Sequence, residues 1–117
     1  MKYEKKVVNQ VVLIKIFEPR IDTSKSPDLK KELLGWIVQD LPNLVLDLAK
    51  VEYMDSSGLG AILFGIRQAQ RFQGNLVIIN LGQQVKKLLE IAHLTKTISV
   101  FASEKEALMY FAQKQKI

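Results

Sequence analysis

Short apolar runs alternate along this chain with longer stretches that have a helical period. Apolar and β-branched residues flank a polar pair at Asn9-Gln10, which predicts a hairpin of two strands between Tyr3 and Phe17. The segments 43–48 and 76–79 are short and almost continuously apolar, as expected for buried strands, and the second should be a central parallel strand. A final short strand is predicted over 97–101.

Capping and turn residues predict where the helices begin and end. Ser26 and Pro27 are suited to the N-cap and the first position of a helix that Pro42 ends. A second helix follows Asp55 and stops at 73–75, and a third follows Gly82. Ser103 and Glu106 have the spacing of a capping box, which predicts a fourth helix after them. The expected apolar faces are Leu29, Leu33, Trp36, Ile37 and Leu41; Leu59, Ile62, Leu63 and Ile66, with Gln70 breaking the stripe; Val85, Leu88, Leu89 and Ala92; and Ala107, Leu108 and Phe111.

The order of these elements indicates the fold class. Strands and helices alternate after the hairpin, and this alternation implies right-handed crossovers and a parallel sheet. The hairpin adds an antiparallel pair. We therefore expect an α/β fold with a mixed sheet and about four helices, with residues 18–27 forming a polar loop.

Composition narrows the class of protein further. A chain of 117 residues that is 48% hydrophobic fits one domain with a real core. It has no cysteine, which excludes disulfides, thiolate metal sites and a cysteine nucleophile. The charged N-terminus lacks a signal-peptide pattern, and no segment is long and apolar enough for membrane insertion, so we expect a cytoplasmic protein.

The charge is basic, with 17 Lys and Arg against 12 Asp and Glu and a net charge of +5. Lysines occur in pairs rather than in long runs, and no aromatic residues are interleaved with them for base stacking. We interpret them mainly as solvated faces and expect no direct nucleic-acid binding. A docking surface for a partner is the other interpretation.

The junction from Asp55 to Gly60 holds two adjacent hydroxyls where a strand passes into a helix. Ser56 or Ser57 is a natural N-cap. A phosphoryl group on Ser56 would lie at a helix N-terminus, where the free amides and the dipole tolerate it, and its charge beside Asp55 would disturb a partner. The two interpretations, a cap and a switch, both remain open on physical grounds.

Other chemistries fit the sequence poorly. A serine hydrolase would need His93, the only histidine, which lies near a predicted helix end, and Gly-x-Ser-x-Gly is absent. Neither nucleotide-binding glycine motif occurs, and Gly58 and Gly60 alone are weak evidence. Asp47, Asp55 and His93 lack metal-ligand spacing. We expect no enzyme activity, no cofactor and no metal.

Two segments resemble the signature of a known family. The runs Leu44-Val45-Leu46-Asp47-Leu48 and Tyr53-Met54-Asp55-Ser56-Ser57-Gly58-Leu59-Gly60 are similar to those of anti-sigma factor antagonists, the bacterial branch of STAS domains. The order of elements agrees along nearly the whole chain, so the resemblance implies one STAS domain over 1–117.

The resemblance implies a switch in sigma factor regulation. In that family an anti-sigma factor serine kinase phosphorylates the serine after the aspartate, which corresponds to Ser56. The unphosphorylated form captures the anti-sigma factor, a PP2C-type phosphatase restores the serine, and ATP belongs to the kinase. The residues implied near the partner surface are Asp22, Thr23, Asp55, Ser57, Gly58 and Leu59.

Two departures from the family pattern qualify this comparison, and two further features have alternative interpretations. Pro19 lies near a position where the family prefers glycine, and Ala92-His93-Leu94 replaces a segment that often has glycine before leucine. Asp22 and Thr23 also fit a simple turn in which the Asp side chain binds local amides. Phe64 falls opposite the apolar stripe of its helix, near Arg67 and Arg71, where it is either an exposed interface anchor or buried against a neighbouring helix.

A second function is compatible with the same family. The chain would then be a STAS subunit with a scaffolding role in a lipid-transport or stress-signalling complex, and Ser56 would only cap its helix. Pull-down of a membrane transporter subunit would favour this alternative, whereas pull-down of a kinase together with a sigma factor would favour the switch.

Overall fold

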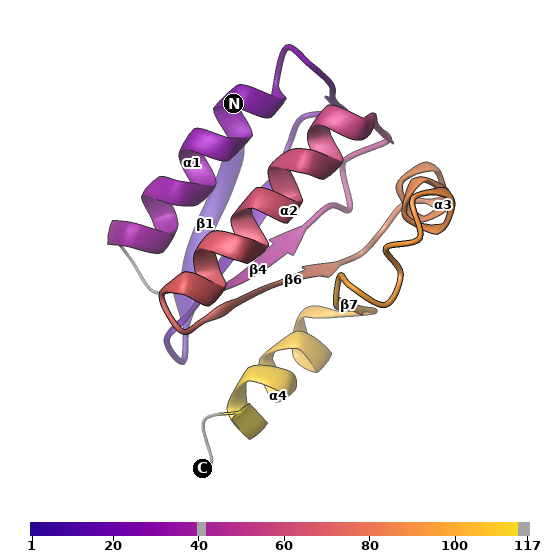
Figure 1. Cartoon of the computed structure of the whole chain (residues 1–117). Helices are drawn as coiled ribbons and strands as arrows, with labels where there is room; N and C mark the ends of the chain where they lie inside the picture. Colours follow the sequence, from indigo (N-terminus) through magenta and orange to yellow (C-terminus); the bar gives the residue numbers. More distant parts are fainter. Residues whose placement is uncertain (40–41, 115–117) are drawn as a thin grey trace.

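The computed structural model of the chain describes residues 1–39 and 42–114. Figure 1 shows strands and helices that alternate after an N-terminal hairpin, as the sequence pattern predicts. In chain order the elements are β1 (Tyr3–Val8), β2 (Val11–Ile16), β3 (Arg20–Ile21), α1 (Ser26–Gln39), β4 (Asn43–Asp47), β5 (Tyr53–Met54), α2 (Ser56–Arg71), β6 (Asn75–Ile79), α3 (Gln83–Ile91), β7 (Val100–Phe101) and α4 (Glu104–Lys114).

The main sheet is mixed, and this confirms the predicted fold class. Its strand order is β1-β2-β4-β6-β7, in which β1 is antiparallel to β2 and the other neighbours are parallel. Asn9 and Gln10 form the hairpin turn with φ values of 51° and 67°. Left-handed conformations at both positions match the right-handed twist of the flanking strands. Strand β6 has a partner on each side, so the prediction that it lies inside the sheet is correct.

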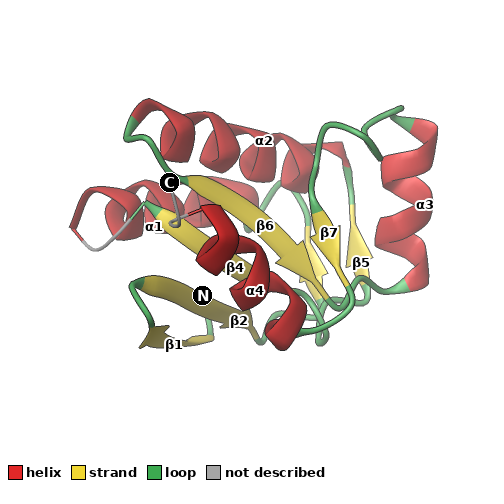
Figure 2. Cartoon of the chain, turned by 90° about the horizontal axis from the view of Figure 1, so that it is seen from below, coloured by secondary structure: helices red, strands yellow, loops and turns green. Residues whose placement is uncertain are grey.

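Helices cover the two faces of the sheet unequally. Helices α1 and α2 pack on one face, α4 lies on the other, and α3 lies beside the end of the sheet near β7 (Figure 2). The larger core joins α1 and α2 to Ile14 and Leu46, and the smaller one joins Ala107 and Phe111 to Val45. No helix in the described ranges has the length and hydropathy needed to cross a bilayer.

Most predicted helix boundaries agree with the structure, with small corrections. Helix α1 starts at Ser26, and the carbonyl of Lys25 accepts its first intrahelical hydrogen bond, so Ser26 is not the N-cap. Ala92 is exposed at the C-cap of α3 rather than on its apolar face. The last strand covers Val100–Phe101 only, because residues 95–98 form turns and a bend. Leu41 lies outside the described residues.

Two helices end on a non-glycine residue in the left-handed region. Gln73 follows α2 with a φ of 65°, and His93 follows α3 with a φ of 57°. In both turns the next residue donates back to the last helical turn, from Gly74 to Ala69 at 2.8 Å and from Leu94 to Leu89 at 2.9 Å. His93 is therefore a helix-terminal residue, as the sequence predicts.

Gly74 is needed for close packing rather than for its φ. A Cβ there would lie 2.1 Å from the carbonyl oxygen of Pro42, a backbone atom that cannot rotate away.

At the start of α4 the predicted capping pair forms in part. The amide of Glu106 donates to the Ser103 hydroxyl at 3.2 Å, and the Glu106 carboxylate accepts from Ala102 rather than from Ser103.

Candidate functional site

A second, very small sheet builds the site around Ser56. Strands β3 and β5 pair in parallel, with Arg20 opposite Tyr53 and Ile21 opposite Met54. The amides of Glu52 and Tyr53 donate to the Pro19 carbonyl, at 2.8 and 3.1 Å. The sequence pattern does not predict this pairing, because it indicates a polar loop over residues 18–27, where the structure has β3. It brings the Asp22 end of that segment beside Asp55.

Asp55, and not Ser56 or Ser57, is the N-cap of α2, which corrects the sequence-based prediction. Its backbone is extended, with φ −104° and ψ −174°, because it directly follows β5. Its Oδ1 accepts from the amides of Ser57 at 2.9 Å and Gly58 at 3.2 Å, and from the Ser57 hydroxyl. Asp55 therefore caps helix α2, and neither serine serves as its N-cap.

The two serines differ in what holds their hydroxyls. Ser57 is half-buried, and its hydroxyl donates to Asp55. Ser56 is exposed in the first turn of the 16-residue helix α2, and its hydroxyl makes no hydrogen bond within residues 1–39 and 42–114. Because the Ser56 hydroxyl is exposed and makes no hydrogen bond there, its oxygen is free to attack the phosphorus atom of an incoming phosphoryl donor.

Gly58 and Leu59 lie beneath this surface. Leu59 is 5% exposed and belongs to the larger core. Gly58 is buried against β3 and β5, where a Cβ would lie 2.6 Å from Cγ of Met54 and 2.8 Å from the carbonyl oxygen of Ile21. Both residues, expected near a partner surface, are buried and pack beneath the first turn of α2, which carries Ser56.

Asp22 and Thr23 follow β3 and lie at the same end of the small parallel sheet as Asp55, which follows β5. Thr23 is exposed, and Asp22 accepts from the amide of Ser24 at 3.0 Å and from its hydroxyl at 2.7 Å. These hydrogen bonds lower the pKa of Asp22 from its ordinary value, and the bond from the Ser24 hydroxyl has the largest effect. The local turn, one of the two interpretations of Asp22 and Thr23, is therefore present, and the segment before it is joined to the site by the Asp55 amide, which donates to the Ile21 carbonyl at 3.3 Å.

Asp55 is held in its ionised form by the same kind of bonding. Its pKa is lowered, first by the hydrogen bond from the Ser57 hydroxyl, while the negative charge of Asp22 acts in the opposite direction. The site therefore presents two ionised carboxylates beside an exposed serine. A lowered pKa means that the cap stabilises the fold above the ordinary aspartate range, and that this contribution is lost as the pH falls through the lowered value.

Removing the Ser57 hydroxyl should raise the pKa of Asp55. In Ser57→Ala the largest stabilising contact of the carboxylate disappears, and the amide bonds from residues 57 and 58 remain. The measurement is an NMR titration of the side-chain carboxyl carbon. Ser56→Ala is the control, because its hydroxyl does not touch Asp55 in the structure, and an equal shift in both variants would contradict the assignment.

The structure gives the position of Phe64, for which the sequence leaves two interpretations. The ring is half-buried on the side of α2 that packs on α1, and Nζ of Lys30 lies 5.6 Å from its centroid. Phe64 therefore lies beside the neighbouring helix α1 with part of its ring exposed.

Sequence analysis did not identify Gln84 as part of the site. Its side-chain oxygen accepts from the amide of Met54 at 2.8 Å, and its nitrogen donates to the Met54 carbonyl at 2.9 Å. No periodic or motif signal marks this glutamine, because its role depends on where α3 lies relative to β5.

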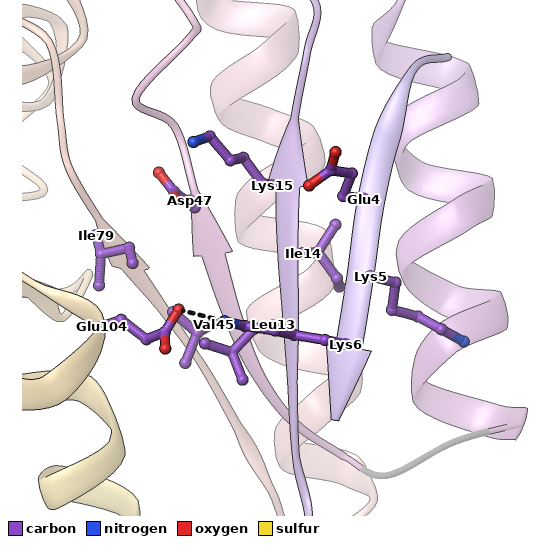
Figure 3. Close-up of a pocket in the computed structure, with 10 residues that line it drawn as sticks. All are labelled: Glu4, Lys5, Lys6, Leu13, Ile14, Lys15, Val45, Asp47, Ile79 and Glu104. Carbon is purple, nitrogen blue, oxygen red and sulfur yellow. Dashed lines mark ion pairs between the residues drawn. The ribbon is translucent and has the colours of Figure 1, made fainter. Parts of the chain in front are cut away.

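A cavity of about 270 Å³ lies away from this site, on the face of the sheet that α4 covers only in part (Figure 3). Its floor is apolar and includes Leu13 and Val45, and the exposed ion pair of Lys6 and Glu104, at 3.2 Å, crosses it. Among the described residues, no group of three or more acidic or histidine side chains is arranged to hold a metal ion.

Comparison with known proteins identifies the family to which these features belong. The family model described as "STAS domain" matches residues 2–107. The anti-sigma-B factor antagonist of Listeria monocytogenes is 33% identical over 80 residues, which cover 68% of this chain and 70% of the relative. A protein of Bordetella bronchiseptica named as the anti-sigma factor antagonist BtrV is 27% identical over 100 residues, 86% of each chain.

Solved structures show the same fold. SpoIIAA, named as an anti-sigma factor antagonist, superposes in its unphosphorylated form with a TM-score of 0.79 and 21% identity, over 96% of this chain and 97% of that one. The phosphorylated form of Bacillus SpoIIAA gives a TM-score of 0.70 and 20% identity, over 94% and 99% of the two chains. At these identities the superpositions establish the arrangement of elements.

Proposed function

The chain belongs to the STAS domain family, and we propose that it acts as an anti-sigma factor antagonist whose binding is switched by phosphorylation of Ser56. The observation that carries the proposal is the difference between the two serines. The Ser57 hydroxyl is engaged by the cap, while Ser56 is exposed at the start of α2. The names of the two relatives support the same role.

The unphosphorylated chain is proposed to bind an anti-sigma factor that is itself a serine kinase. The surface includes Ser56, Thr23 and the two carboxylates of Asp22 and Asp55. A dianion added at Ser56 would be tolerated by the first amides of α2, since the helix dipole favours negative charge there. The added charge would instead weaken the complex with the partner. In the interface it would lie near the carboxylates of Asp55 and Asp22 without water to screen the repulsion.

The rest of the cycle is assigned to other proteins. The chain is proposed to be a binding module and not an enzyme, with ATP consumed by the kinase and the serine restored by a PP2C-type phosphatase. The place of action that fits a regulator of sigma factors is the cytoplasm. Bound to this chain, the kinase would be withheld from its sigma factor.

The proposal predicts that the kinase modifies one serine. When the chain is incubated with Mg-ATP and its cognate anti-sigma factor kinase, peptide mass spectrometry should find one phosphoryl group, on Ser56. Ser57→Ala should still be modified and Ser56→Ala should not. Unmodified Ser56, or modification of Ser57 instead, would contradict the proposal.

A further inference from the structure

Strand β5 lies directly before the turn that positions Ser56, and another strand forms main-chain hydrogen bonds with only one of its edges. It is two residues long, and β3 is its only strand partner in the described residues. The amides of Tyr53 and Asp55 point toward β3, where they reach the carbonyls of Pro19 and Ile21 at 3.1 and 3.3 Å. By the alternation of a strand, the amide and carbonyl of Met54 point to the opposite edge.

That opposite edge is closed by a side chain rather than by another strand. The Gln84 amide accepts from the Met54 amide and donates to the Met54 carbonyl, at 2.8 and 2.9 Å. These two bonds are the ones that a neighbouring strand would supply. Both are partly buried, where an unpaired backbone group is costly.

We infer that Gln84 is a positioning residue for the phosphorylation switch: through Met54 it fixes the strand that presents Ser56, and it makes α3 move together with that strand. Its functional meaning rests on the function proposed above. Without Gln84, β5 would keep a single main-chain partner of two residues, and a two-stranded ribbon of that size is marginal in water. The segment from Tyr53 to Asp55 would then open locally more often than the main sheet.

The test uses exchange at amides that Gln84 does not itself bond. In the full chain with Gln84→Ala, NMR hydrogen exchange of Tyr53 and Asp55 should accelerate about tenfold, the size expected for the loss of one or two net hydrogen bonds. The Ile78 amide, bonded to Ser99 at 3.0 Å in the main sheet, should be unchanged. The matched control is Gln83→Ala, an exposed neighbour on the same helix without a side-chain hydrogen bond in the described residues.

Two exchange results would overturn the inference. One is unchanged exchange of Tyr53 and Asp55 in Gln84→Ala. The other is acceleration of Ile78 by the same factor, which would mean a global loss of stability. Neither result depends on a partner, so this arm is independent of the proposed function.

A kinase arm then tests the link to the switch. If the wild-type chain is phosphorylated at Ser56, Gln84→Ala should be modified more slowly than Gln83→Ala, and equal rates would overturn the link. A wild-type chain that the kinase leaves unmodified counts against the proposed function, and the exchange pattern still decides whether Gln84 positions the strand.

Discussion

Ser56→Asp should bind the anti-sigma factor kinase about 10 to 100 times more weakly than the wild-type chain, whereas Ser56→Ala should bind about equally well. The range corresponds to roughly 1.4 to 2.8 kcal/mol, within the cost of a like-charge contact in an interface. A new carboxylate at this exposed position joins those of Asp22 and Asp55, and closure by a partner removes the water that screens all three. Isothermal titration calorimetry with the purified kinase measures both affinities.

The control for added charge is Gln113→Glu. Gln113 is exposed on α4, across the sheet from α2, so its new charge should leave the affinity unchanged. If Ser56→Asp binds as tightly as Ser56→Ala, charge at this position does not control association. If Gln113→Glu weakens binding as much as Ser56→Asp, the effect comes from net charge and not from the site.

Gly58→Ala should destabilise the fold by about 1 to 3 kcal/mol, the usual cost of overpacking a filled interior. The added methyl would lie 2.6 Å from Met54 Cγ and 2.8 Å from the backbone oxygen of Ile21. The side chain of Met54 can move, but Ile21 is fixed by its pairing in the small sheet. Urea unfolding followed by circular dichroism gives the change, as a shift in midpoint without a change in slope.

Gly60→Ala is the matched comparison in the same helix. Nothing lies within 4 Å of a Cβ built on Gly60, so the substitution removes a flexible residue from a helix without a clash. It should stabilise the chain by up to about 1 kcal/mol. The two alanine variants should therefore have opposite signs, and stabilisation of similar size in both would mean that helix propensity, rather than the contact with β3 and β5, decides the result.

The main sheet could be predicted because its strands have strong local signals. The run from Val11 to Ile14 and the polar pair at Asn9-Gln10 determine a hairpin, since side chains on a strand alternate and a two-residue turn fixes the register. The buried strands β4 and β6 are continuously apolar because helices cover both faces of the sheet there.

The sequence alone locates the site, but it does not predict the strand pairing and hydrogen bonds that form it. Strands β3 and β5 contain two residues each, too few to show any period. Asp55, Ser56 and Ser57 all have good capping side chains, and the choice among them depends on β5 ending at Met54, which only tertiary pairing determines. Gln84 was missed for the same reason, because its hydrogen bonds cross 30 residues of sequence.

The chain has one tryptophan, and its position provides an optical signal separate from the switch. Trp36 is 5% exposed on α1, and its ring lies 4.7 Å from that of Tyr3 on the edge strand β1. Its emission therefore reports whether the N-terminal hairpin is docked on the helical layer. A red shift on denaturation would follow global unfolding, while a charge placed on Ser56 should leave the spectrum unchanged, so the same fluorescence sample can show that a binding-defective variant is still folded.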